Sequence, residues 1–147
     1  MNEVLIYTDG STMQNPGPGA YGFIAVENDE IVYKYGEFVD MMTNNQAELM
    51  ATISSIEWFV DKYDSNTNLT IRTDSRYCQM GYNKWMHHWS KNGWKRKDGE
   101  SVVNIDLWVK LLNYSYEHPN VKFEWIKGHN GNKHNEMVDE MCKKIWK

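Results

Sequence analysis

The sequence predicts an α/β fold whose five-stranded mixed sheet has three antiparallel strands followed by parallel strands and is flanked by helices. Three observations support this prediction. The first strand-like segments are joined by a short polar turn, which favours an antiparallel hairpin. The later strands are separated by helical periodicity, which provides the crossovers that parallel strands need. Strand-like runs at 6–9 and 71–74 both end in Thr-Asp and then break, which suits parallel neighbours with a common carboxyl edge.

The first part of the chain is predicted to supply the antiparallel strands. Residues 3–8 form the first strand. The Pro-Gly pairs at 15–19 then form a stiff turn, because Pro fixes φ and Gly admits the left-handed region. Residues 21–27 and 31–39 form two further strands, which the polar turn at 28–30 joins into a hairpin.

Beyond residue 40 the apolar period changes from that of a strand to that of a helix. Apolar side chains recur between Leu49 and Val60 at helical spacing, and Thr43 or Asn44 is the predicted N-cap. A fourth strand is predicted at 69–73. A short helical piece follows from residue 75 to about residue 83.

The last third of the chain is predicted to contain a helix, a strand and a final helix. Asn104 opens the first of these helices, which has an apolar pattern over 107–112. Residues 121–126 form the fifth strand, and the apolar pattern over 138–145 marks the last helix. The sequence shows no internal repeat and no linker, so residues 1–147 are predicted to form a single domain that is large enough to bury a core.

Composition limits the setting of the protein. No apolar run approaches the roughly 18 residues of a membrane-spanning helix, and the N-terminus lacks a signal-peptide pattern, so no membrane partner is expected. Cys78 and Cys142 have no partner at metal-ligand or CxxC spacing, which favours a reduced, cytoplasmic location. Nothing in the sequence marks an oligomer, and a monomer is expected.

The charge of the chain is segregated. The net charge is −4, but residues 84–97 carry five Lys or Arg side chains and no acid, which leaves −9 for the rest of the chain. A local basic segment says more about a nucleic-acid partner than the total charge does. The segment 84–97 is therefore a candidate nucleic-acid contact.

Four acidic residues are predicted to converge at the carboxyl edge of the sheet. Asp9 and Asp74 end the two matching runs, Glu48 lies in the first turn of the first helix, and Asp139 lies beside an apolar position of the last helix. Clustered carboxylates raise one another's pKa, and Mg²⁺ relieves this repulsion because it takes a few carboxylates together with water and substrate phosphate. Two such ions about 4 Å apart clamp both oxygens of an in-line phosphoryl displacement. Each acid alone also suits a turn or a helix start, but their joint placement favours a metal site.

These motifs, taken in order, resemble the type 1 ribonuclease H family of bacteria and phages. The resemblance covers nearly the whole chain. The five matching segments are 7–11 with 15–19, 43–49, 73–75, 127–131 and 135–140. The resemblance implies a ribonuclease H-like fold and an endonuclease that cuts the RNA strand of RNA–DNA hybrids with two Mg²⁺ ions, for which Mn²⁺ can substitute, leaving 5′-phosphate and 3′-hydroxyl ends. The catalytic metal ligands that it implies are Asp9, Glu48, Asp74 and Asp139.

A fifth catalytic candidate is His129, which lies in a glycine-flanked loop before the last helix. A histidine in a loop is often a solvated surface residue. Its titration near neutrality also suits a proton shuttle or a role in product release, and the family resemblance favours this functional interpretation.

The segment around 84–99 resembles the basic protrusion of bacterial members, which grips the DNA strand. Its cations would hold phosphates, and an aromatic side chain would lie against a sugar or base. By resemblance Trp85 is the expected DNA contact, whereas Trp89 suits inward packing equally well. The predicted cationic contacts are Lys95, Arg96 and Lys97.

Further substrate contacts are predicted from amide and hydroxyl side chains. Asn15, Asn44 and Asn45 can meet sugar hydroxyls and base edges, which distinguish RNA from DNA. Asn15 and Asn44 also suit a turn and a helix cap, and both roles can coexist. The resemblance adds Thr43 and Asn104 as residues that seat a DNA phosphate.

Three alternatives remain open. A DNA-cutting enzyme of the same fold, such as a transposase or junction resolvase, would use the same acids. A catalytically inactive nucleic-acid-binding module would not need all four of them, and a purely structural domain would leave the basic segment unexplained. One departure from the family pattern is Arg76, where bacterial relatives often carry Gln; an Arg at this position can add a phosphate contact or change the substrate preference.

Overall fold

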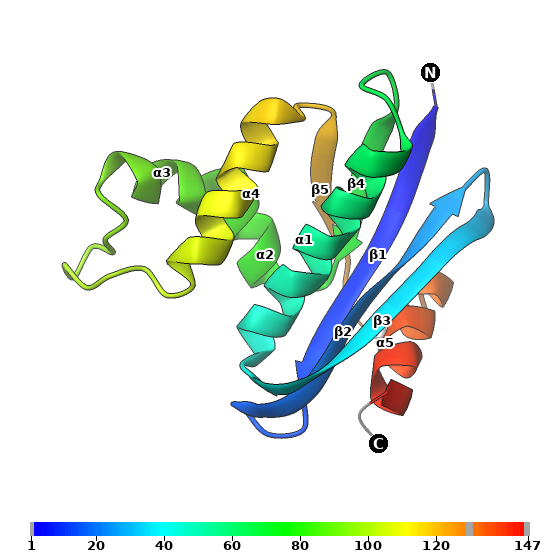
Figure 1. Cartoon of the computed structure of the whole chain (residues 1–147), viewed down its shortest axis with the longest axis horizontal. Helices are drawn as coiled ribbons and strands as arrows, with labels where there is room; N and C mark the ends of the chain where they lie inside the picture. Colours follow the sequence, from blue (N-terminus) through cyan, green and yellow to red (C-terminus); the bar gives the residue numbers. More distant parts are fainter. Residues whose placement is uncertain (1, 129–130, 146–147) are drawn as a thin grey trace.

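The computed structural model describes residues 2–128 and 131–145, and it confirms the predicted α/β fold with a five-stranded mixed sheet (Figure 1). The strands are β1 (Glu3–Thr12), β2 (Gly17–Glu27), β3 (Glu30–Met42), β4 (Asn68–Thr73) and β5 (Val121–Trp125). The helices are α1 (Asn44–Lys62), α2 (Arg76–Met80), the π-helical turn η1 (Gly81–Trp85), α3 (Met86–Lys91), α4 (Ile105–Glu117) and α5 (Lys133–Ile145). The sheet order is β3-β2-β1-β4-β5, antiparallel from β3 to β1 and parallel from β1 to β5.

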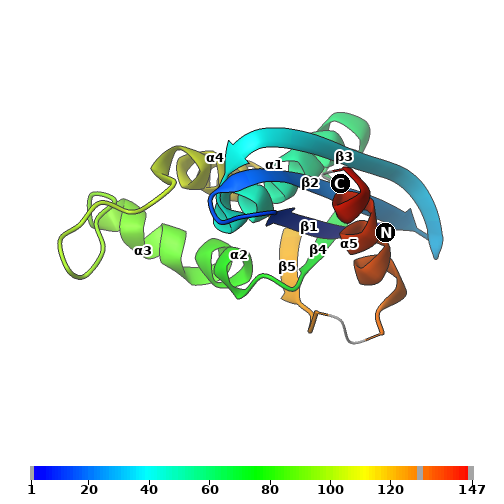
Figure 2. The same ribbon diagram turned by 90° about the horizontal axis from the view of Figure 1, so that it is seen from below.

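Two helical layers cover the sheet. In Figures 1 and 2, α1 and α4 lie on one face and α5 lies on the other. Because side chains alternate along a strand, β1 serves both layers: Val4 and Ile6 join the large core that includes α1 and α4, whereas Tyr7 packs with Val138 and Cys142 of α5. The central strand is therefore buried on both faces, which fixes the position of its carboxyl end.

The strand β1 is longer than predicted. The expectation that the strand stops at Asp9 is wrong, because β1 continues to pair with β2 through Thr12, and Asp9 lies opposite Gly22. The parallel pairing of β1 with β4 does end earlier, at Tyr7 opposite Arg72. Asp9 thus lies just beyond the parallel ladder, at the edge where the sequence analysis expected it.

The helix α1 begins in a capping box, which selects Thr43 over Asn44 as the N-cap. Gln46 N donates to Thr43 Oγ1 (3.1 Å), and Thr43 N donates in return to Gln46 Oε1 (2.8 Å). Since the helix starts at Asn44, Glu48 lies in its second turn and not in the first as predicted. From this position in the second turn of α1, the side chain of Glu48 reaches the backbone of β1.

The helical segment after β4 extends to Lys91, beyond the predicted end near residue 83. Tyr82 and Met86 are buried and Trp89 is half-buried, so the apolar spacing continues into the basic segment and keeps the chain helical. Gly81 begins the π-helical turn, and a Cβ there would lie 2.0 Å from Trp108 Cη2 of α4. The protrusion is thus an extension of a packed helix. No helix within the described ranges is long and apolar enough to cross a membrane.

Candidate active site

The structure brings three of the four predicted acids together at the edge of the sheet. Asp9 of β1, Glu48 of α1 and Asp74, which follows β4, each offer one carboxylate oxygen within 4.8 Å of the others. Asp9 and Glu48 are buried, and Asp74 is half-buried. Three separate elements therefore converge on one point.

Glu48 is held by the backbone of β1. Its Oε1 accepts a hydrogen bond from Gly10 N at 2.8 Å, in a buried position. The contact requires close packing, because a Cβ on Gly10 would lie 2.5 Å from the carbonyl carbon of Ala47. That Gly10 supports Glu48 was not predicted from the sequence, and its place directly after Asp9 was the available signal.

Asp74 is held by the segment that follows β5. The indole Nε1 of Trp125 donates to the main-chain oxygen of Asp74 at 3.0 Å. A Cβ on Gly128 would lie 2.6 Å from Asp74 Oδ2, so the backbone passes directly beside this carboxylate. On the other side Ser75 caps α2 by accepting from Cys78 N. Trp125 and Gly128 are also site residues that the sequence analysis missed.

The fourth acid, Asp139 of α5, lies outside the group of three but close to it. Its Oδ2 pairs with Lys143 Nζ at 3.1 Å, one turn along the helix. The negative charge of Asp139 still contributes to the raised pKa of Asp9. Asp139 is therefore at the border of the cluster, with a lysine as its present partner.

Burial and mutual repulsion change the titration of the cluster. Desolvation, followed by the charges of Asp74 and Asp139, raises the pKa of Asp9 to about 7 from an ordinary 3.8. The pKa of Glu48 is raised well above its usual value, again by burial first and then by the charges of Asp9 and Asp74. The ionised cluster is thus unfavourable unless a cation neutralises it.

The donor set fits a hard divalent cation. Asp9 Oδ2 and Glu48 Oε2 are buried and have no hydrogen-bond partner among the residues that the structure describes. Buried polar atoms of this kind normally have partners, and carboxylate oxygens are the ligands that Mg²⁺ and Mn²⁺ accept. The predicted ligands Asp9, Glu48 and Asp74 can hold such an ion together, with Asp139 at the margin.

The predicted amide contacts lie at the start of α1. Asn15 Oδ1 accepts from Asn44 N (3.0 Å), and Asn44 Oδ1 accepts from both the N and the Oγ1 of Thr12 (2.9 and 2.8 Å). Asn15 and Asn44 therefore do have the local structural role that the sequence analysis considered. Asn45 is exposed beside them. His129, the fifth catalytic candidate, lies outside the described residues.

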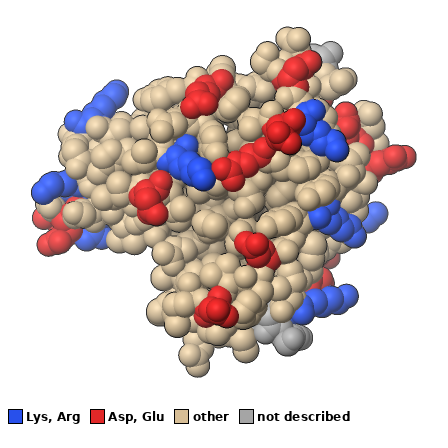
Figure 3. Space-filling model, viewed as in Figure 1, with Lys and Arg blue, Asp and Glu red and all other residues tan. Residues whose placement is uncertain are grey.

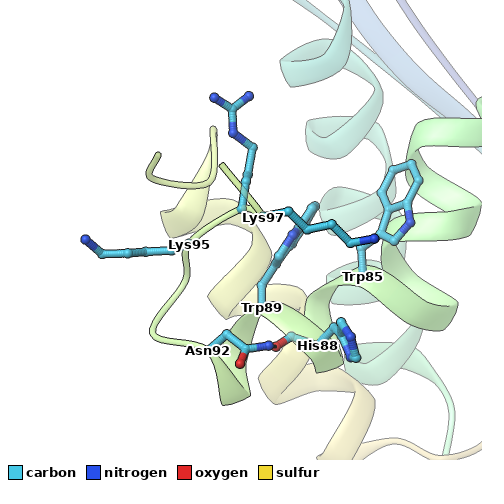
Figure 4. A pocket seen from close by; sticks show the side chains of 7 residues that line it. Trp85, His88, Trp89, Asn92, Lys95 and Lys97 are labelled. Carbon is cyan, nitrogen blue, oxygen red and sulfur yellow. Dashed lines mark hydrogen bonds between the residues drawn. The ribbon is translucent and has the colours of Figure 1, made fainter. Parts of the chain in front are cut away.

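The basic segment forms a groove at the far end of the molecule. Its volume is about 620 Å³, and Figure 4 shows its lining side chains. The lining residues are Trp85, His88, Trp89, Asn92, Lys95, Arg96 and Lys97. The structure thus brings together Trp85 and the three predicted cations, and Trp89 both lines the groove and packs on Trp108, with ring centroids 5.7 Å apart.

The charge of this protrusion is mixed at its tip. Figure 3 shows Lys and Arg side chains at the end of the molecule where the protrusion lies, with acidic side chains next to them. Arg96 pairs with Asp98 (3.3 Å), and both side chains are largely exposed. Such a pair is weak, so Arg96 can exchange this partner for a phosphate.

Asn104, a predicted phosphate contact, and Arg76, the departure from the family pattern, both have aromatic neighbours. Asn104 precedes α4 with a left-handed backbone (φ 63°), and its Nδ2 donates to the Tyr77 hydroxyl at 3.4 Å. The Arg76 guanidinium lies over the Trp125 ring at 3.7 Å from the centroid. Trp125 therefore contacts both Arg76 and the main chain of Asp74.

The fold and the acidic cluster are typical of metal-dependent nucleases, and comparison with known proteins identifies the family. The RNase H family model matches residues 1–147. A curated Ribonuclease H of Enterobacter sp. (strain 638) is 42% identical over 142 residues, which are 96% of this chain and 87% of that protein. The chain therefore belongs to the RNase H family, and the prediction of a ribonuclease is confirmed.

Solved structures agree with this assignment. The crystal structure of LC9-RNase H1, a type 1 RNase H, superposes with a TM-score of 0.85 at 28% identity and covers 99% of this chain and 72% of that chain. LC11-RNase H1 in complex with RNA/DNA hybrid has a TM-score of 0.71 at 23% identity, with 98% of this chain and 99% of that chain covered. The predicted ribonuclease H-like fold is confirmed.

Replacing Gly10 by Ala is expected to destabilise the protein by about 2 kcal/mol or more, because the new Cβ meets backbone atoms of Ala47 that cannot move aside alone. The shift also separates Gly10 N from Glu48, so turnover falls as well. Urea unfolding and initial rates measure the two effects. Ser11→Ala, which adds no atom, is the control, and a Gly10→Ala protein with wild-type stability and rate would contradict the close packing.

Proposed function

We propose that this chain is an endonuclease that hydrolyses the RNA strand of RNA–DNA hybrids and leaves 5′-phosphate and 3′-hydroxyl ends. The observation that carries the proposal is the convergence of Asp9, Glu48 and Asp74, with two buried carboxylate oxygens that lack partners within the described part of the chain. Membership of the RNase H family and the fold shared with a hybrid-bound relative support the choice of substrate.

We propose that Asp9, Glu48, Asp74 and Asp139 hold two Mg²⁺ ions, for which Mn²⁺ can substitute. The ions would supply activation of the attacking water and stabilisation of the departing 3′-oxygen. Asp9 would be a ligand in this set, because it belongs to the group of three acids and the charges of both Asp74 and Asp139 raise its pKa. Asp139 would exchange Lys143 for a metal ion, because this pair joins a half-buried carboxylate to an exposed lysine and such partly solvated pairs are weak. His129 is proposed to move protons or to assist product release.

Recognition of the hybrid would use two separate surfaces of one catalytic domain, residues 1–147. Near the acids, Asn15, Asn44 and Asn45 present amides at the start of α1, suited to the 2′-hydroxyl and base edges of RNA. The groove of the protrusion, around 84–99, presents cations and Trp85 to the phosphates and sugars of the DNA strand. Thr43 and Asn104 are proposed to seat a DNA phosphate.

The test offers labelled RNA–DNA hybrid, duplex RNA and duplex DNA to the protein with Mg²⁺, Mn²⁺ or chelator. Cleavage confined to the RNA strand of the hybrid, abolished by chelator, with product ends verified by enzymatic labelling, is the expected result. Cutting of duplex DNA would instead support a DNA-cutting enzyme of this fold. Binding of the hybrid without cleavage in any metal would support an inactive binding module, and either outcome would overturn the proposal.

Replacing Lys95, Arg96 and Lys97 together by Gln is expected to raise KM for the hybrid about tenfold or more at moderate salt, with little change in kcat. Phosphate contacts position the substrate without taking part in the reaction, and each contact contributes to the salt dependence of binding. Steady-state kinetics at two salt concentrations measure the effect. Replacing Lys62, at the end of α1 and outside the groove, by Gln is the control. An unchanged KM in the triple variant would remove the groove from the substrate path.

A further inference from the structure

One cation next to the acidic cluster has no role in the proposed mechanism. Arg76 is the first residue of α2 and is exposed. Its guanidinium carbon, Cζ, lies over the Trp125 ring, 3.7 Å from the ring centroid. The distance is well within the range of a cation–π contact. The side chain is therefore held in one place although it faces solvent.

Arg76 also differs from the other two arginines in its partners. Arg72 pairs with Glu124 and Arg96 pairs with Asp98, each at 3.3 Å. Within residues 2–128 and 131–145, no carboxylate lies within 4.0 Å of Arg76. Its fork of N–H donors is thus available to an anion from outside the protein.

Trp125, the ring under Arg76, is hydrogen-bonded to the edge of the sheet that carries the acids. The same Trp125 that carries the guanidinium donates its indole N–H to the main-chain oxygen of Asp74 at 3.0 Å. Arg76 follows Asp74 by two residues, so that their Cα atoms are at most about 7 Å apart. A phosphate placed at the acids therefore has its neighbour along the strand within reach of a long arginine side chain.

We propose that Arg76, held on the face of Trp125, binds a backbone phosphate of the RNA strand next to the phosphate that is cut. This inference rests on the proposed function, since it takes the strand at Asp74 to be RNA. Stacking occupies the face of the guanidinium and leaves its edge free, which is the geometry for bidentate contact with phosphate. A Lys at this position would keep the positive charge, but it would lose both the stacking on Trp125 and the bidentate hydrogen bonding to phosphate.

The first test measures hybrid binding by fluorescence anisotropy over a series of salt concentrations, in the Asp9→Asn background so that the substrate stays intact. Arg76→Gln is expected to raise Kd about five- to tenfold and to reduce the slope of log K against log salt by about one. Arg76→Lys should keep the slope and regain only part of the affinity. The matched control is Lys62→Gln, because Lys62 also lies over a tryptophan, Trp58, at 5.9 Å, but at the opposite end of α1 from the acids.

A second test locates the contact. A hybrid with one methylphosphonate lacks the charge of a single phosphate and is expected to bind less tightly. When the neutral position is the RNA phosphate adjacent to the cut, this loss of binding free energy should no longer add to the loss caused by Arg76→Gln. Non-additivity only on the DNA strand, or a salt slope in Arg76→Gln equal to that of Lys62→Gln, would overturn the inference. Cleavage of the unmodified hybrid by the protein with wild-type Asp9 is scored separately, so failure of the proposed function is distinguished from failure of this contact.

Discussion

Replacing Asp9 by Asn is expected to lower hydrolysis of the hybrid at least about a thousandfold while the protein remains folded. Asn has nearly the same shape as Asp but no negative charge, so the cluster of three carboxylates loses one buried charge that would hold a metal ion. Metal ions contribute several kcal/mol of charge stabilisation to phosphoryl transfer, and each 1.36 kcal/mol corresponds to a factor of ten in rate.

The same reasoning applies to Asp74→Asn, because Asp74 belongs to the same cluster. Its main-chain oxygen still receives the Trp125 hydrogen bond after the substitution, so the local backbone should be preserved. Initial rates under saturating Mg²⁺ measure the loss, and circular dichroism verifies the fold. Asp61→Asn, on an exposed position of α1, is the matched control. If either site variant retains near-wild-type rates in Mg²⁺, that carboxylate is not a metal ligand.

The sequence could predict the topology and the acids because both depend on local patterns. Alternating side chains, the two N-cap candidates Thr43 and Asn44 and the helical period after them are all readable in a short window. The two Thr-Asp runs correctly predicted the edge of the sheet at which the acids lie, even though Asp9 does not end its strand. Asp9 does not end the strand because β1 continues to pair with β2 through Thr12. No residue of β1 itself indicates this continuation.

The supports of the site were less predictable because they depend on contacts between distant segments. Gly10 N meets Glu48 only because β1 and α1 pack without a side chain between them, and Trp125 reaches Asp74 across 51 residues. The continued helix from Tyr82 to Met86 was missed for the opposite reason. Tyr82, Met86 and Trp89 recur at helical spacing in the sequence, but the basic side chains among them were interpreted as a nucleic-acid-binding segment that follows the helix.

The second large effect expected from the structure is a loss of stability as pH rises in the absence of metal, and its reversal by Asp9→Asn. The native pKa of Asp9 is about 7, above the 3.8 of an unperturbed Asp. The native state therefore binds more protons than the unfolded state between these values, and the free energy of unfolding falls with increasing pH. The contribution of Asp9 is fully present below about pH 4 and is lost by about pH 7, and at 1.36 kcal/mol per pKa unit it amounts to about 4 kcal/mol.

Other groups of the protein also titrate over this range, so the informative quantity is the difference between two proteins. In chelator, the free energy of unfolding of the wild type should fall relative to that of Asp9→Asn as the pH rises from 4 to 8. The reason is that Asn cannot acquire the buried charge. The variant is therefore expected to be the more stable protein at pH 8, a gain in stability at the expense of activity.

Addition of Mg²⁺ should reverse this order at pH 8. A cation that binds the ionised native cluster stabilises the native state in proportion to the logarithm of its concentration above Kd, whereas Asp9→Asn has lost a ligand and gains less. Urea unfolding at four pH values, with chelator and with Mg²⁺, measures all these quantities. Parallel pH profiles for the two proteins in chelator, or equal stabilisation of both by Mg²⁺, would show that Asp9 does not carry the buried charge that the metal is expected to neutralise.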